Sequence, residues 1–273
     1  MAGGVSTAAL AAAVCDAGGL GFLAGGYKSA HAMGREITEL RTLTDAPFGV
    51  NLFVPGPQDT DIAAFERYRA ELEPEARRYG VELAQPPAHD DDEFEQKLSV
   101  LITERVPVAG FTFGCPPAPV IERLHEAGIE AVVTVTSAQE AAIAASAGAD
   151  VLCVQGPEAG GHRGGFTPLP AEQAQIGLLP LTTLVRQAVD VPLIAAGGIA
   201  DGHAVAAALA CGALAAQLGT AFLRTPQSGA HPLHKAALID PGFPGTSVTS
   251  AFTGRPARCL TNRFAAAHRG PVP

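Results

Sequence analysis

The feature that most constrains the fold is a layout that recurs along the chain. A short apolar run is followed by a glycine-containing loop, then by an alanine-rich helical stretch, and then by Ala-Gly or Cys-Gly before the next apolar run. The clearest examples are LHEAGIEAVVTVTSAQEAAIAASAGADVLCVQG at 124–156 and DVPLIAAGGIADGHAVAAALACGALAAQLGT at 190–220. Each predicts a helix capped by glycine, a buried strand, a loop and another helix. This is the pattern of βα units with parallel strands covered on both faces.

Seven apolar runs along the chain predict strands of such a sheet. They are residues 19–25, 48–54, 106–114, 130–136, 149–155, 191–197 and 213–219. Residues 55–104 form a longer insertion with two polar helical patterns, at 59–80 and 91–106, and the acidic stretch at 89–95 predicts a solvated surface turn. Strands separated by helices on this scale fit either a (β/α)8 barrel or an open doubly wound sheet.

Polar or glycine-rich residues lie in or directly after nearly every predicted strand. They are Asn51, Cys115, Ser137, Gln155, Gly197-Gly198 and Gly219-Thr220. A barrel gathers the carboxyl ends of all its strands into one site, whereas an open sheet uses only the ends beside its switch point. We therefore predict an α/β fold of the TIM (β/α)8 type. It lacks its first strand and carries a helical insertion after the third barrel strand.

The stretch GPEAGGHRGG at 156–165 follows the predicted strand at 149–155 and is the first candidate for chemistry. Its glycines let the backbone approach a ligand and let the His162 imidazole reach inward. A neutral imidazole can exchange a proton near neutral pH, so His162 is predicted to be a catalytic base or a hydrogen-bond donor. The alternative is an exposed histidine in a surface loop. Arg163 could contact a phosphate or a neighbouring carboxylate.

The loops after the last two predicted strands are candidates for a phosphate site. Gly197-Gly198 precede a helix whose expected N-cap is Asp201, and Gly219 and Thr220 follow the final strand. Barrels commonly bind phosphate between these two loops through backbone N–H groups and a helix N-terminus. An acidic chain can therefore still hold a phosphorylated cofactor. The alternative is that the glycines serve close packing.

Three further polar residues sit at the same face. Asn51 interrupts an apolar strand, and an unsatisfied amide there would cost ~1–3 kcal/mol. The edge of a flavin ring would satisfy it, and so would a structural bond to a neighbouring loop; Gln155 has the same two interpretations. Cys115 lies at this face without a paired base in the sequence, which argues against a nucleophile.

Composition excludes several classes of protein. A net charge of −9 argues against a nucleic-acid partner. Five cysteines occur without a CxxC pair or a histidine at metal-ligand spacing, which predicts no metal site and a reducing, cytoplasmic location. The uncharged stretch 204–223 is interpreted as helix, turn and buried strand, so no membrane partner is predicted, and the N-terminus lacks the basic region of a signal peptide.

Six separated motifs together resemble one known family. They are, in chain order, MAGGVST, AGGLGFLAGGY, PFGVNLFVP, EAGGHRGG, IAAGGIADG and QLGTAFL. Over residues 1 to 224 the chain resembles the nitronate monooxygenases, formerly called 2-nitropropane dioxygenases. The resemblance implies an FMN-dependent TIM barrel that oxidises alkyl nitronates with oxygen to carbonyl compounds and nitrite. The implied partners are a small nitronate and oxygen, and a homodimer is compatible with it.

The resemblance also assigns roles to individual residues. It implies that the histidine of GGHRG, His162, is catalytic. It would abstract a proton from a neutral nitroalkane or orient the nitro group of the anion. The FMN contacts that it implies are Asn51, Gln155, Gly160, Gly198, Gln217, Leu218, Gly219 and Thr220. Most of these positions also emerged from the strand-end argument.

The resemblance predicts a single FMN-binding domain over 1–273, with the insertion at 55–104. Relatives have a strand ahead of the AGG motif and a segment beyond the NRF motif, so both are expected to be truncated here. The strands that begin near Gly19 and Ala213 would then be the two sheet edges. Two alternatives to nitronate oxidation are an FMN-dependent enoyl-acyl-carrier-protein reductase using NAD(P)H and an FMN-binding protein without activity.

Overall fold

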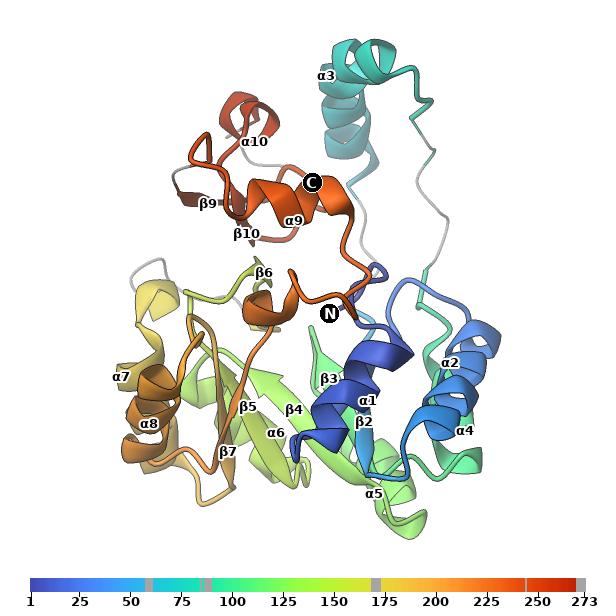
Figure 1. The fold of residues 1–273 in the computed structure, drawn as a ribbon, viewed down its shortest axis with the longest axis vertical. Coiled ribbons are helices and arrows are strands. Elements are labelled where there is room, and N and C mark those ends of the chain that lie inside the picture. The colour runs from blue at the N-terminus through green and yellow to red at the C-terminus, as the bar shows by residue number, and fades with distance from the viewer. Residues whose placement is uncertain (57–60, 84, 86–89, 168–172, 244, 269–273) are drawn as a thin grey trace.

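The computed structural model describes residues 1–56, 61–83, 85, 90–167, 173–243 and 245–268. Seven parallel strands form one curled, barrel-like sheet in the order β1-β2-β3-β4-β5-β7-β8, as Figure 1 shows. Their bounds are β1 Gly21–Ala24, β2 Phe48–Phe53, β3 Val108–Thr112, β4 Glu130–Val135, β5 Val151–Gln155, β7 Leu193–Ala196 and β8 Ala215–Gln217. All seven strands predicted from the sequence are confirmed, and the outer strands of the order are β1 and β8, as expected.

Helices connect the strands and cover the outer face of the sheet. They are α1 Ala8–Asp16, α2 Ala30–Leu43, α4 Phe94–Thr103, α5 Ala118–Glu126, α6 Ala138–Ser146, α7 Leu178–Ala188 and α8 Gly202–Ala210. Gly128, Gly148 and Gly212 follow α5, α6 and α8 with φ of 73°, 98° and 95°. Glycine adopts this left-handed conformation at little cost, so the recurrent Ala-Gly and Cys-Gly pairs end the helices as predicted. Asp201 caps α8 through a 2.9 Å bond from the Ala204 N–H.

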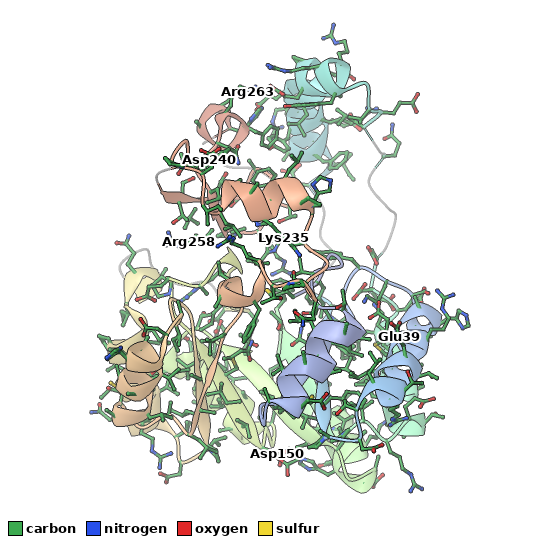
Figure 2. The ribbon with its side chains drawn as sticks, in the orientation of Figure 1. Glu39, Asp150, Lys235, Asp240, Arg258 and Arg263 are labelled. Atoms are coloured by element: carbon green, nitrogen blue, oxygen red, sulfur yellow. The ribbon has the colours of Figure 1, made fainter. Side chains whose placement is uncertain are left out.

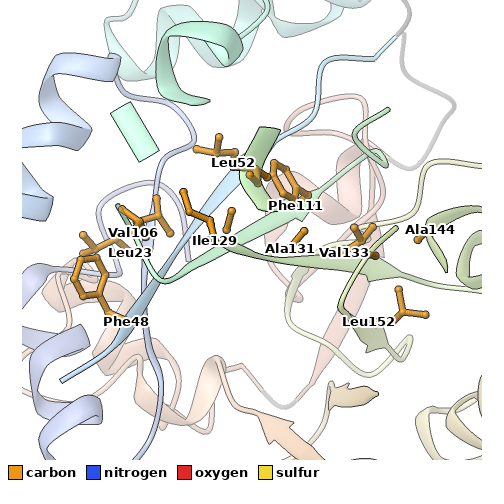
Figure 3. Packing of buried hydrophobic residues seen from close by; sticks show 14 of the residues in the cluster. Leu23, Phe48, Leu52, Val106, Phe111, Ile129, Ala131, Val133, Ala144 and Leu152 are labelled. Carbon is orange, nitrogen blue, oxygen red and sulfur yellow. The ribbon is translucent and has the colours of Figure 1, made fainter. Parts of the chain in front are cut away.

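Side chains alternate between the two faces of the sheet. In β4, Ala131, Val133 and Val135 are fully buried against the helices. Val132 lies on the opposite face in a small cluster with Cys153 and Ala196. The larger cluster, part of which Figure 3 shows, joins the sheet to its helices. Burial on both faces explains why the strands read as continuous apolar runs.

Two details of the prediction are wrong or need refinement. The strand near 213–219 was expected to be buried, but Ala215 and Gln217 in β8 are exposed because β8 is an outer strand of the sheet. The insertion at 55–104 contains two helices of different kinds. Helix α4 packs on α2 and β2 as an ordinary barrel helix, and α3, Ile62–Tyr79, rises away from the barrel (Figure 1).

The C-terminal part of the chain forms a second layer above the carboxyl ends of the strands. A three-stranded antiparallel sheet has the order β6-β10-β9, with β6 Gly161–His162, β10 Ala257–Leu260 and β9 Thr246–Thr249. Helices α9, Pro232–Ala237, and α10, Arg263–Ala267, accompany it. Arg263 joins α10 to α3 through 2.6 Å bonds to both carboxylate oxygens of Glu75 (Figure 2). None of the helices in the described ranges is both long and apolar enough to cross a membrane.

Candidate active site

The loop that carries His162 is held by the C-terminal hairpin. His162 pairs with Ala257, and Gly161 pairs with Arg258, so the loop forms strand β6 of the small sheet. The Arg258 guanidinium donates to the carbonyl of Pro157 at 2.8 and 3.0 Å (Figure 2). A residue about a hundred positions away in sequence thus fixes the start of the loop, and the loop is a supported strand rather than a free surface turn.

His162 itself is half-buried at the carboxyl ends of the barrel strands. Its Nε2 lies 2.6 Å from the Thr253 hydroxyl, and its ring stands edge-on to Phe113 at 5.9 Å. Burial, and then the charge of Arg255, lower the pKa of His162 below its ordinary value. The imidazole is therefore neutral at neutral pH. When the Thr253 hydroxyl accepts from Nε2, the Nδ1 lone pair is available to take a proton.

Gln155 and Arg163 hold the loop from below. Gln155 donates to the His162 carbonyl at 3.0 Å and accepts from the Gly164 N–H at 2.8 Å. Arg163 donates to the Gln155 carbonyl at 2.7 Å and to the Thr136 carbonyl at 3.3 Å, close to two carboxylates. Arg163 therefore secures the loop against the strand ends through backbone carbonyls, which is neither of the two contacts predicted from the sequence. Gln155 therefore makes the structural bonds to a neighbouring loop that were the alternative to a flavin contact. One hydrogen and one oxygen lone pair of its side-chain amide stay available.

A buried carboxylate joins this loop to the end of β4. Glu140, in the first turn of α6, is fully buried. Its Oε2 accepts from the N–H and hydroxyl of Thr136 at 2.6 and 2.9 Å. Its Oε1 accepts from the N–H groups of Phe166 and Thr167 at 2.6 and 2.8 Å, and from the Thr167 hydroxyl at 3.0 Å. Glu140 therefore joins the end of β4, at Thr136, to the end of the histidine loop, at Phe166 and Thr167.

A chain of polar side chains runs across the strands under the loop. Thr112 donates to Asn51 Oδ1 at 3.1 Å, and its hydroxyl lies 3.4 Å from that of Thr134. Thr134 also bonds the Cys153 thiol, which in turn donates to Gln217 Oε1 at 3.4 Å. The chain joins the two predicted cofactor residues Asn51 and Gln217 through β3, β4 and β5.

The donors of the Asn51 amide are largely unused. Its Nδ2 has one bond to a described residue, a long 3.5 Å contact to the carbonyl of Leu52. Gly110 makes room for the side chain, since a Cβ at that position would lie 2.9 Å from Asn51 Oδ1. The amide thus satisfies its acceptor internally and presents N–H donors for an external acceptor, such as the carbonyl and nitrogen edge of a flavin.

The two glycine loops predicted to bind phosphate lie next to the His162 loop. Gly198 has φ of 68°, and a Cβ there would lie 3.0 Å from the Glu158 side chain. A Cβ on Gly160 would lie 2.5 Å from the Thr220 hydroxyl, so the loops after β5 and β8 touch at a glycine. The N–H groups of Gly198, Gly219 and Thr220 donate to no described backbone or side-chain acceptor. Uncommitted N–H groups from adjacent loops fit a phosphate. The side chain of Leu218, another predicted FMN contact, packs on the hydrophobic core.

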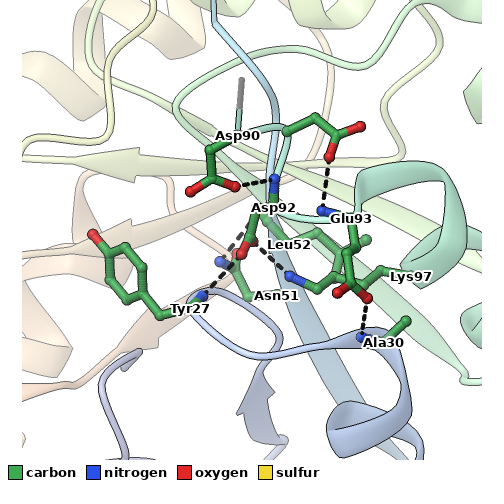
Figure 4. Close-up of polar contacts among 9 residues, drawn as sticks. Tyr27, Ala30, Asn51, Leu52, Asp90, Asp92, Glu93 and Lys97 are labelled. Carbon is green, nitrogen blue, oxygen red and sulfur yellow. Dashed lines mark hydrogen bonds and ion pairs between the residues drawn. The ribbon is translucent and has the colours of Figure 1, made fainter. Parts of the chain in front are cut away.

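The acidic stretch predicted to be a solvated turn is exposed at Asp90, Glu93 and Glu95, but it also makes structural contacts; residue 89 lies outside the described residues. Asp92 lies 2.8 Å from the ammonium of Lys97, whose side chain is 1% exposed, and accepts from the Tyr27 N–H at 3.1 Å (Figure 4). Glu93 accepts from the Ala30 N–H at the start of α2. The acidic side chains pair a buried cation and fix the loop after β1, which places Tyr27 at the candidate site.

The thiols of Cys115 and Cys153, which lie at the candidate site, offer no nucleophile. Burial raises the pKa of Cys115 to about 11 and that of Cys153 to about 12, so both are protonated at neutral pH. Cys115 contacts no described base, and its thiol is directed at the carbonyl of Pro116. Within the described residues no group of three or more His, Cys, Asp and Glu side chains could hold a metal ion.

Sequence reasoning found His162 but missed the residues that surround it. Thr253 and Arg255 lie in the turn between β9 and β10, and Glu140 looked like an ordinary residue in the first turn of a helix. A glycine-containing turn between the short runs TSVT and ARCL was the one available signal for the hairpin. Nothing in the sequence of that turn indicated that the hairpin pairs with the histidine loop.

Comparison with known proteins decides the family. The model of the family described as "Nitronate monooxygenase" matches residues 1–271. The chain belongs to the nitronate monooxygenase family. It is 42% identical to a nitronate monooxygenase of Paraburkholderia phytofirmans over 98% of this chain and 74% of that protein. It is 39% identical to a probable nitronate monooxygenase of Staphylococcus saprophyticus, over 96% of this chain and 74% of that protein.

Solved structures agree with this family. The chain is similar to a nitroalkane oxidase from Streptomyces ansochromogenes, with a TM-score of 0.96 and 53% identity, over 100% of this chain and 78% of that one. It is less similar to FabK from Thermotoga maritima, with a TM-score of 0.74 and 34% identity, over 98% of this chain and 71% of that one. The resemblance and the TIM-barrel-like fold predicted from the sequence are confirmed, and the nitronate monooxygenase family makes the chain an oxidoreductase.

Proposed function

We propose that the chain oxidises alkyl nitronates to a carbonyl compound and nitrite, with FMN as cofactor and oxygen as the oxidant. In this reaction the carbon that bears the nitro group is oxidised, its bond to nitrogen breaks, and oxygen is reduced. The observation that carries the proposal is the neutral, half-buried His162. It is held at the carboxyl ends of the strands beside two loops with uncommitted N–H groups. Family membership supports the choice of substrate class.

The described residues fit FMN in two places. The N–H groups of Gly198, Gly219 and Thr220 would hold its phosphate, and Gly160 allows the neighbouring loop to approach them. The unused donors of Asn51 would face an acceptor on the ring. The remaining predicted contacts are Gln155, Gln217 and Leu218. When bound, FMN supplies the electron acceptor for the substrate and the group from which oxygen takes the electrons.

The role proposed for His162 depends on the form of the substrate. With a neutral nitroalkane, Nδ1 would remove the proton from the carbon that bears the nitro group. With the nitronate anion, the imidazole would orient the nitro group. Thr253 holds the ring in either case. We further propose that residues 1–273 act as one FMN-binding unit, because the site takes residues from both the barrel and the C-terminal hairpin. Homodimer assembly and a cytoplasmic location stay predictions.

The test is the visible absorption spectrum of the purified protein before and after anaerobic addition of a nitronate. We expect flavin bands that bleach. The variant His162→Ala should keep its flavin and bleach about 10² to 10⁴ times more slowly with a neutral nitroalkane. The control His31→Ala changes an exposed histidine on α2 and should bleach like the wild type.

Four outcomes would contradict the proposal. A colourless protein that takes up no added FMN would refute the cofactor, and normal bleaching of His162→Ala would refute the role of the histidine. Bleaching by NADH, with turnover of an enoyl thioester but none of a nitronate, would favour the acyl-carrier-protein reductase instead. Flavin that no donor reduces would favour a binding protein without activity.

A further inference from the structure

A row of aromatic rings leads across the strand ends to His162. Tyr27 stands edge-on to Phe53 at 5.1 Å between ring centroids, and Phe53 packs on Phe113 at 4.7 Å. Phe113 in turn meets the His162 ring at 5.9 Å. The rings come from the ends of β1, β2 and β3 and from the histidine loop. They form a continuous row of ring contacts that ends at the candidate catalytic group.

Two of these rings are held in an uncommon backbone conformation. Phe113 has φ of 71° and Tyr27 has φ of 63°. A bulky residue at positive φ is strained, and such residues cluster at functional sites. The Phe113 N–H donates to the Gly164 carbonyl at 3.2 Å, and the Tyr27 N–H is fixed by Asp92. The fold therefore stabilises, at both ends of the row, conformations that the residues alone would avoid.

Arg255 covers the end of the row next to His162. The centre of its guanidinium lies 4.5 Å from the centroid of the Phe113 ring. Arg255 comes from the same β9–β10 turn as Thr253. Burial and then the charge of Arg255 lower the pKa of His162, whereas burial raises the pKa of Tyr27 and the charge of Arg255 opposes that rise. The charge of Arg255 thus acts electrostatically on both ends of the aromatic row, at His162 and at Tyr27.

Arg255 differs from the two other arginines around the loop. Arg163 and Arg258 both donate to carbonyl groups and so stabilise the chain. Arg255 is exposed and makes no ion pair or hydrogen bond with any described residue. Stacking on Phe113 leaves all five N–H donors of the guanidinium available. A cation with unused donors beside a base and an apolar surface has the chemistry of a receptor for a small organic anion.

We propose that Arg255 binds the two oxygens of the substrate's nitronate group and makes the enzyme selective for the anion over the neutral nitroalkane. The aromatic row Tyr27, Phe53 and Phe113 packs against the alkyl part. This inference rests on the proposed oxidation of nitronates and names the residue that recognises them. A planar guanidinium matches the two-oxygen geometry of a nitronate as it matches a carboxylate. The anion is thereby brought next to the His162 imidazole.

The kinetic test compares Arg255→Gln and Arg255→Lys with the control Arg35→Gln, which changes an exposed arginine on α2. For Arg255→Gln we expect kcat/KM for a nitronate to fall about 10- to 100-fold, mainly through KM, as for the loss of a charged hydrogen bond. The kcat/KM for the matching neutral nitroalkane should change less than about threefold. The ratio of the two kcat/KM values, which measures the preference for the anion, should therefore fall. Arg255→Lys should keep part of the preference because it keeps the charge.

A second test needs no turnover. Isobutyrate, an inert carboxylate of similar shape, should bind the wild-type protein and bind Arg255→Gln about tenfold or more weakly. The pKa of His162, followed by NMR of its ring protons and assigned by their loss in His162→Ala, should rise in Arg255→Gln. Arg255 is the charged group that acts on His162 among the described residues; its other neighbours, Thr253 and Phe113, are uncharged.

The outcomes separate this inference from the proposed function. Equal losses for the nitronate and the neutral nitroalkane, or unchanged affinity of Arg255→Gln for isobutyrate, would overturn the role of Arg255. Binding of isobutyrate that depends on Arg255, in a wild-type protein that oxidises no nitronate, would refute the proposed function and leave the anion site standing. Normal thermal unfolding of Arg255→Gln is expected, since the side chain is exposed and stacks on one ring.

Discussion

Glu140 offers a sharp test of how the histidine loop is held. In Glu140→Ala, the N–H groups of Thr136, Phe166 and Thr167 lose their acceptor. A buried donor left without a partner costs about 1–3 kcal/mol. Three donors set a range of roughly 3–9 kcal/mol for the loss in the free energy of unfolding.

The lower end of that range is expected. Thr136 is 1% exposed, but Phe166 and Thr167 are half-buried, so water can reach their N–H groups after the change. Removing the carboxylate also removes the cost of burying its charge. We therefore expect a loss of about 3–5 kcal/mol. This is a large part of the ~5–15 kcal/mol typical of a native protein.

Urea unfolding of the wild type, Glu140→Ala and Glu140→Gln measures this loss. Glu140→Gln keeps one carbonyl acceptor and should fall between the other two. The control Glu122→Ala alters an exposed glutamate in the middle of α5 and should change the free energy of unfolding by no more than ~0.5 kcal/mol. Hydrogen exchange at the amides of Phe166 and Thr167 should accelerate in Glu140→Ala. A loss below about 1 kcal/mol with unchanged exchange would refute the clamp.

Two other predictions follow from the site. Gly198→Asp should lose FMN, measured by fluorescence titration, because a negative charge would meet the phosphate. Aspartate tolerates positive φ comparatively well, so the uncharged control Gly198→Ala should bind FMN more tightly than Gly198→Asp, and equal affinities would place the phosphate elsewhere. For a neutral nitroalkane, kcat/KM should fall on the acid side with a midpoint below 6.5. Burial and Arg255 lower the pKa of His162 below that ordinary value, so the active neutral imidazole persists to lower pH, and a midpoint above 6.5 would contradict this reasoning.

The sequence predicted the barrel well because its signals are local. A buried parallel strand needs a continuous apolar run, and a helix that ends at a left-handed residue favours glycine. Successive helices end in this way at Gly128, Gly148 and Gly212, so the order of strands and helices could be read along the chain. The position of His162 followed from the same count, since it lies seven residues after the end of β5.

The roles of individual polar residues were less predictable. Asn51 was expected either to face a flavin or to bond a neighbouring loop. The structure shows its acceptor bonded to Thr112, while its donors make one long bond to the Leu52 carbonyl. The acidic stretch was expected to be a solvated turn, and nothing in the sequence indicated that its Asp92 pairs with the buried Lys97. In both cases the partner lies on another strand or helix, and no periodic pattern relates the two positions.

The sequence alone therefore determined the order of the βα units, the ring of glycine and polar residues at the strand ends, and the histidine that lies among them. Tertiary structure decided what surrounds that histidine. The pairing of Gly161–His162 with Ala257–Leu260 brings Thr253 and Arg255 to the imidazole across about ninety residues of chain. Contacts of such long range depend on how the C-terminal hairpin packs over the barrel, and backbone pairing of a two-residue strand leaves almost no trace in composition or periodicity.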